Sequence, residues 1–169
     1  MKQALDIARE SLGEGEFPVG CVLVAGGEIV GRGRRVRSFG PFQNELDHAE
    51  MRALADMSGS RGAVSGLVAY STLEPCLMCL GGLVLNGVRR IVYAYEDVMG
   101  GACGLSLSSV RSQAGAEEGP GFYGSLGLEI VRGLLREESR VLLAAFFSDP
   151  ERKYWRGSPL AHHALGRIP

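Results

Sequence analysis

Residues 67–95 read LVAYSTLEPCLMCLGGLVLNGVRRIVYAY, and the order of the apolar runs in this stretch decides the fold. Residues 67–71 are a short apolar run that predicts a buried strand. Residues 76–85 are largely apolar over the length of a helix, and Asn86-Gly87 ends that helix. Residues 90–95 have the composition of a further strand. The strand, helix, strand order predicts an α/β domain with a partly parallel sheet.

The segments on either side continue this alternation. Paired glycines at Gly26-Gly27 supply the positive φ that a two-residue hairpin needs, so the strands that they join are antiparallel and the sheet is mixed. We expect helices at 1–12, 48–57 and 134–147, strands at 19–25, 28–30 and 128–131, and loops at 38–47 and 115–124. A polar, aromatic tail follows Pro150.

The composition is that of one globular domain. The chain has 169 residues, of which 46% are hydrophobic and 22% charged, with a net charge of −1. No apolar run reaches the roughly 18 residues that span a bilayer, and the N-terminus lacks a signal-peptide pattern. We therefore expect a cytosolic protein that does not enter membranes. The four cysteines are too few for a disulfide scaffold.

Two segments concentrate positive charge. Residues 32–37 contain four arginines and no acidic residue. Residues 151–169 contain four basic residues and one acidic residue, Glu151. Such segments suit a phosphate-bearing partner, but they are also typical of solvated faces. The cations are Arg32, Arg34, Arg35 and Arg37 in the first segment, and Arg152, Lys153, Arg156 and Arg167 in the second.

Metal-binding side chains cluster at the starts of two predicted helices. Cys76 and Cys79 are three residues apart, so both thiols face the same way on a helix, and the helix N-terminus favours thiolate. With His48, they offer one imidazole and two thiolates, a set that suits tetrahedral zinc. Three protein ligands leave a fourth position for water, which is typical of catalytic zinc. Glu50, two residues after His48, is placed to move a proton to or from that water.

Each of these residues also has a simpler interpretation. The two cysteines could form a redox pair or be small core residues, His48 could cap its helix, and Glu50 could stabilise the helix dipole. A closed structural zinc site is the sharper alternative, and it needs a fourth ligand. The candidates for that ligand are Cys103, Cys21, His162 and His163.

His-x-Glu followed by Pro-Cys-x-x-Cys resembles the signature of the cytidine and nucleobase zinc deaminases. Further strings resemble the tRNA-specific adenosine deaminase branch of that family. The resemblance covers about residues 1–147, and the matching strings are FPVGCVLV at 17–24, TLEPCLMC at 72–79, RIVY at 90–93 and the stretch 97–104.

This resemblance implies a three-layer α/β/α sandwich with a five-stranded mixed sheet, in which residues 1–147 form a zinc-dependent deaminase domain. Residues 148–169 would then be a helical, aromatic tail packed on the domain or at an interface. The resemblance also implies zinc on His48, Cys76 and Cys79, Glu50 as the proton shuttle, and a homodimer. The substrate-binding residues that it implies are Val19, Arg35, Leu73, Glu74 and Asp97.

The sequence departs from the tRNA-acting branch near the predicted site. The relatives carry an Asn that holds the substrate nucleotide, and the aligned position here falls in Arg34-Arg35, with Arg35 as the favoured equivalent. Residues 44–47 replace the usual small residues before the histidine. Three hypotheses follow. In the first, the chain deaminates adenosine in a tRNA anticodon loop. In the second, it deaminates a free nucleobase, nucleoside or nucleotide of the guanine, cytosine, CMP or dCMP type. In the third, it is a non-catalytic structural zinc protein.

Overall fold

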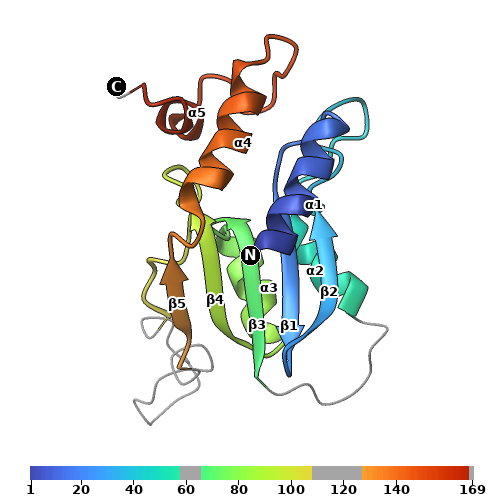
Figure 1. The fold of residues 1–169 in the computed structure, drawn as a ribbon, viewed down its shortest axis with the longest axis vertical. Coiled ribbons are helices and arrows are strands. Elements are labelled where there is room, and N and C mark those ends of the chain that lie inside the picture. Colours follow the sequence, from blue (N-terminus) through green and yellow to red (C-terminus); the bar gives the residue numbers. More distant parts are fainter. Residues whose placement is uncertain (58–65, 108–126, 168–169) are drawn as a thin grey trace, which may run out of the picture.

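A five-stranded mixed sheet lies at the centre of the structure (Figure 1), a computed structural model that describes residues 1–57, 66–107 and 127–167. The predicted loop at 115–124 lies outside these residues. In chain order, the elements are α1 (Lys2–Gly13), β1 (Gly20–Ala25), β2 (Glu28–Arg34), α2 (Ala49–Met57), β3 (Leu67–Leu73), α3 (Leu77–Leu85), β4 (Val88–Tyr95), β5 (Glu129–Arg132), α4 (Arg136–Ser148) and α5 (Pro159–Ala164). Within the described ranges, no helix is long and apolar enough to cross a membrane.

The strand order is β2-β1-β3-β4-β5. Strand β1 is antiparallel to both β2 and β3, whereas β3, β4 and β5 run parallel to one another. The turn between β1 and β2 has Gly26 at φ 57° and Gly27 at φ 88°, which is the conformation that the paired glycines predict. The expected mixed sheet and its opening hairpin are therefore confirmed.

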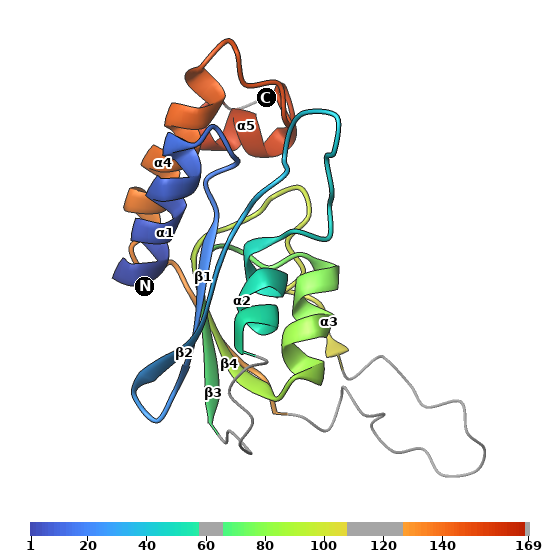
Figure 2. The ribbon, with the colours of Figure 1, turned by 90° about the vertical axis from the view of Figure 1, so that its right-hand side faces the viewer.

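Helices cover both faces of this sheet (Figure 2). Helices α1 and α4 lie on one face, and α2 and α3 lie side by side on the other. Both layers bury apolar side chains against the sheet, among them Leu83 of α3 and Leu143 of α4. This arrangement confirms the expected three-layer α/β/α sandwich.

Helix α2 lies unusually close to β2 because Gly33 has no side chain. A Cβ on Gly33 would lie 2.0 Å from the Ala49 carbonyl oxygen and 2.4 Å from the Ala53 amide nitrogen. The first turn of α2 thus rests directly on the strand. This contact fixes the position of His48 and Glu50 relative to the sheet.

Several elements begin or end at other residues than the sequence predicts. Strand β2 continues past the predicted Val30 to Arg34, because its pairing with β1 extends to Gly20 opposite Arg34. The helix predicted from 76 begins at Leu77, with Cys76 as its extended N-cap residue. Helix α4 begins after Leu135, whose left-handed φ of 59° separates it from β5.

The tail after α4 returns to the body of the protein. It contains α5, whose Leu160, Ala161 and Ala164 belong to the main core. Glu96, directly after β4, joins both C-terminal helices to the sheet: its carboxylate accepts hydrogen bonds from Arg136 of α4 (2.8 Å from Nε) and pairs with His163 of α5 (2.7 Å).

We expect Gly33→Ala to lower the free energy of unfolding by about 1–3 kcal/mol, because the added methyl group must push α2 away from β2. The matched control is Gly81→Ala in α3, where an added Cβ meets nothing within 4 Å. This substitution should stabilise the helix by up to about 1 kcal/mol, because alanine favours the helical conformation more than glycine does. Urea denaturation measures the free energy of unfolding of both variants. Equal urea midpoints for the two variants would contradict the close packing of α2 on β2.

The Glu96 carboxylate makes the stability of the fold sensitive to acid. Burial opposes the shift, but the bonds from Arg136 and His163 lower the pKa of Glu96 to about 2. The ionised form therefore stabilises the fold above the unfolded pKa of about 4.3, and this contribution disappears as the pH falls toward 2. Glu96→Gln should lower Tm at neutral pH, and the difference in Tm between this variant and the native chain should vanish near pH 2. Glu138→Gln, on the exposed side of α4, is the charge-matched control and should leave Tm at neutral pH nearly unchanged.

Candidate metal centre and active site

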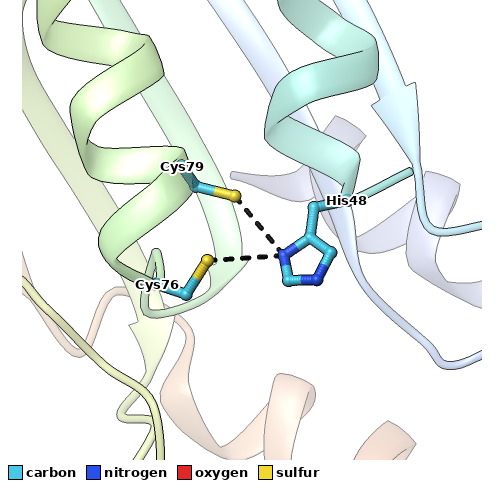
Figure 3. A group of neighbouring side chains, drawn as sticks. All are labelled: His48, Cys76 and Cys79. Atoms are coloured by element: carbon cyan, nitrogen blue, oxygen red, sulfur yellow. Dashed lines mark hydrogen bonds between the residues drawn. The ribbon is translucent and has the colours of Figure 1, made fainter. Parts of the chain in front are cut away.

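Three metal-binding side chains meet between the starts of α2 and α3. His48 immediately precedes α2, Cys76 is the N-cap residue of α3, and Cys79 lies in its first turn. The two helices lie side by side on one face of the sheet, so residues nearly thirty positions apart converge (Figures 1 and 3). The Nδ1 atom of His48 lies 3.5 Å from the Cys76 Sγ and 3.4 Å from the Cys79 Sγ.

This geometry fits zinc better than it fits hydrogen bonds alone. A single ring nitrogen has one lone pair or one proton in its plane, yet two sulfurs lie at almost equal distances from it (Figure 3). Zn–N and Zn–S bonds of about 2.0 and 2.3 Å at a tetrahedral angle would place the nitrogen about 3.5 Å from each sulfur. The donor set and its spacing therefore match a zinc ion held by His48, Cys76 and Cys79.

The thiols differ in how readily they ionise. The hydrogen bond from Cys79 lowers the pKa of Cys76 to about 4, and the His48 imidazole contributes to this shift while burial opposes it. The same hydrogen bond and burial raise the pKa of Cys79. Cys76 can therefore bind a cation as a thiolate, whereas the Cys79 thiol loses its proton when a metal ion binds in its place.

Glu50 lies beside this cluster, buried in the first turn of α2. Its side chain is 3% exposed, and burial raises the pKa of its carboxyl group. The Ser71 hydroxyl, within β3, donates a hydrogen bond of 2.7 Å to Oε1 of Glu50. Ser71 was not among the residues predicted from the sequence, since only the arrangement of α2 on the sheet brings it to Glu50.

A cavity of about 280 Å³ opens over the cluster. All five residues that the resemblance implied for substrate binding line its wall, together with His48, Glu50 and Cys76. Those five residues are Val19, Arg35, Leu73, Glu74 and Asp97. The volume is close to the lower limit of about 300 Å³ for ligand pockets, so it suits one base with its sugar and not a duplex.

Two of these residues organise the rim of the cavity through backbone hydrogen bonds. The Glu74 carboxylate accepts from the amides of Asp97 (3.3 Å) and Cys103 (3.0 Å). The Asp97 carboxylate accepts from the amides of Met99 (2.9 Å) and Gly100 (3.0 Å). Both acids therefore hold the loop after β4 in place over the cavity.

Arg35 lies in the same wall, and its guanidinium is already bonded within the protein. The side chain is 2% exposed; Nη1 donates to the Asn44 carbonyl (2.7 Å) and Nη2 to the Glu45 carboxylate (3.0 Å). Its neighbours in the first basic segment are paired too, Arg34 with Glu14 and Arg37 with Asp47. Three of the four arginines of this segment are thus paired with carboxylates of the same chain.

The cavity wall also includes residues that the sequence did not single out for the site. Glu45 comes from the loop before α2, and Tyr154, Trp155 and Leu160 come from the C-terminal tail. The aromatic character of the tail was visible in the sequence. That it returns to the site was not, because no local spacing connects residues so far apart along the chain.

The fourth ligand required by a closed structural zinc site is not found among the described residues. Within that part of the chain, the group of possible metal donors lying within 4.8 Å of one another consists of His48, Cys76 and Cys79 alone. The four side chains proposed for the additional position lie outside this group: Cys21, Cys103, His162 and His163.

Comparisons with known proteins agree with this site. Residues 1–95 match the family model described as the cytidine and deoxycytidylate deaminase zinc-binding region. The chain is 33% identical to a tRNA-specific adenosine deaminase of Bacillus subtilis over 155 residues, covering 90% of this chain and 89% of that protein. It is 36% identical over 150 residues to a tRNA-specific adenosine deaminase of Streptococcus pyogenes serotype M18, covering 87% of each chain.

The fold is shared with solved structures as well. One comes from a study of A-to-I editing by tRNA:A34 deaminases at the wobble position of transfer RNA. It superposes with a TM-score of 0.64 at 29% identity, covering 84% of this chain and 96% of that one.

We expect Cys79→Ala to abolish tight zinc binding, with an affinity loss greater than the roughly 100-fold that changes next to a ligand cause. The matched control is Cys21→Ala, which removes another buried thiol that lies in β1 outside the cluster. Metal content after dialysis against a weak chelator measures both. A folded Cys79→Ala protein that retains one zinc per chain would contradict the assigned donor set.

Proposed function

The chain belongs to the cytidine and deoxycytidylate deaminase zinc-binding family, and we propose that it deaminates adenosine within a tRNA anticodon loop. It is a zinc-dependent enzyme that deaminates nucleobases or nucleosides. The observation that carries the proposal is the buried Glu50 beside the His48, Cys76 and Cys79 donor set, at the wall of a cavity sized for one base. The names of the relatives support adenosine in tRNA as the substrate.

His48, Cys76 and Cys79 hold the zinc ion in this proposal, and Glu50 moves the protons. When bound there, zinc supplies a water molecule of lowered pKa as the nucleophile. Glu50 accepts a proton from this water and delivers it to the ring nitrogen beside the amine-bearing carbon. The water oxygen bonds to the amine-bearing carbon, and Glu50 then takes the second proton from the added hydroxyl group and gives it to the amine. The carbon–nitrogen bond breaks, so that water and the amino base give a carbonyl base and ammonia.

Burial suits Glu50 to this double role. A carboxyl group whose pKa is raised by burial holds a proton closer to neutral pH, so it can accept one and give it back. The hydrogen bond from Ser71 fixes Oε1 and thereby the orientation of the carboxyl group. We assign Glu50 as the general acid and base on these two features.

The base is bound by the wall of the cavity in this proposal. Val19 and Leu73 offer apolar contact, while Glu74 and Asp97 shape the rim through the loop that they hold. Arg35 shapes the opposite side by fixing the loop before α2. A cavity for a single base requires an unpaired nucleotide, and an anticodon loop provides one.

The wider setting of the enzyme is part of the same proposal. Residues 1–147 form the deaminase domain, and residues 148–169 form a tail packed on the domain or at an interface. We place the enzyme in the cytoplasm, and the resemblance to the tRNA-acting branch implies a homodimer.

The substrate is tested by measuring ammonia release from the zinc-loaded protein. One arm contains an anticodon stem-loop with an unpaired adenosine, and a matched arm contains the same stem-loop with that adenosine paired in a duplex. A third arm contains free purines, pyrimidines and their nucleotides. We expect inosine and ammonia only from the unpaired adenosine. Release from one free small molecule, with none from RNA, would overturn the tRNA assignment in favour of nucleotide metabolism.

Glu50→Gln should lower kcat by about 10²–10⁴-fold while leaving zinc content and Tm nearly unchanged, because it removes the proton carrier and not a metal ligand. Steady-state assays with metal analysis on the same sample measure this. Glu28→Gln, exposed at the start of β2, serves as the matched charge control and should retain full activity. Near-native turnover in a zinc-loaded Glu50→Gln protein would eliminate the assigned role.

A further inference from the structure

One carboxylate oxygen beside the metal centre is approached by three side chains from separate parts of the chain. Oε2 of Glu45 accepts hydrogen bonds from the Tyr154 hydroxyl (2.9 Å) and from Nη2 of Arg35 (3.0 Å). The same oxygen lies 3.5 Å from Nε2 of His48. Arg35 follows β2, His48 precedes α2 and Tyr154 belongs to the tail, so Glu45 joins three segments at one point.

The two ring nitrogens of His48 face different partners. Nδ1 points to the sulfurs of Cys76 and Cys79, and Nε2 lies near the Glu45 carboxylate. A nitrogen that binds a metal must be free of its proton, so the imidazole proton has to be on Nε2. A carboxylate beside Nε2 favours this tautomer and holds the plane of the ring.

The position of the Glu45 carboxylate is itself fixed. Arg35 is almost wholly buried, and a buried guanidinium needs a counter-charge, which Glu45 supplies. On the other side, Tyr154 packs edge-on against Phe17 with ring centroids 5.2 Å apart, and its ring lies 5.5 Å from the Arg35 guanidinium.

We propose that Glu45 is a positioning residue for the zinc ligand His48, and that Arg35 and Tyr154 hold it in place. The C-terminal tail thereby helps to set the orientation of a metal ligand more than one hundred residues earlier in the chain. The proposal rests on His48 as a zinc ligand, but it does not depend on which base is deaminated.

The test measures metal binding, so that it is separate from the test of the substrate. Zinc affinity is determined by competition with a chromophoric chelator, and the absorption spectrum of the cobalt-substituted protein reports ligand geometry. Glu45→Gln keeps the size of the side chain but removes its charge, and we expect zinc affinity to fall by about 10–100-fold with an altered cobalt spectrum. Native affinity and spectrum in a folded Glu45→Gln protein would overturn the proposal.

Two further variants sharpen this test. Tyr154→Phe removes one hydroxyl and leaves the Arg35–Glu45 pair intact, so it tests the tail even if Glu45→Gln does not fold. We expect a several-fold loss of zinc affinity, and unchanged affinity would overturn the role of the tail.

The control is Gln43→Ala, because Gln43 donates to Oε1 of Glu45 (3.2 Å) and not to Oε2. It should bind zinc like the native chain, and an equal loss there would contradict the specific role of Oε2.

The outcomes also separate this proposal from the proposed function. Weakened zinc binding in Glu45→Gln supports the positioning role even if the anticodon stem-loop is not a substrate. Conversely, deamination of the stem-loop by the native chain leaves the tRNA assignment intact even if Glu45→Gln binds zinc normally.

Discussion

The meeting of one imidazole with two thiols depends on the placement of α2 and α3 side by side on the same face of the sheet. The donors sit at the starts of these helices, so both helices must begin at the same end of the sheet. For α3, the parallel pair β3 and β4 meets this condition, because a helix between parallel strands runs back along the sheet. For α2, the absence of a side chain at Gly33 allows the first turn of the helix to pack directly on β2. Both the cavity and the proton carrier depend on this arrangement.

Most of the architecture could be predicted from the sequence because it depends on local patterns. The apolar runs of 67–71 and 90–95 flank a helix-length apolar segment, and that order alone implies a parallel pair. Gly26-Gly27 specifies a tight hairpin through backbone conformation. The metal donors could be predicted for a related reason, since Cys76 and Cys79 are close in sequence and have a chemistry that few other roles require. The ends of elements were less predictable, because Cys76 is a cap residue that only partly belongs to its helix.

The remainder of the site depends on contacts that no local pattern encodes. Ser71 reaches Glu50 across 21 residues of sequence, and Tyr154 reaches Glu45 across 109. The first contact requires the packing of α2 on the sheet, and the second requires the tail to return to the loop before α2. Arg35 illustrates the same limit, because its place in the cavity wall and its internal partners became visible only in three dimensions.

Part of the cavity wall comes from residues 154–160, which are synthesised long after the metal donors. The metal donors lie within the first 79 residues, and four of the five strands are complete by residue 95. Chains emerge from the ribosome N-terminus first, so these elements are available before the tail. Tyr154, Trp155 and Leu160 emerge well after the donors. A nascent chain therefore presents its metal donors early, and the cavity beside them acquires its final shape only after residue 160 has been made.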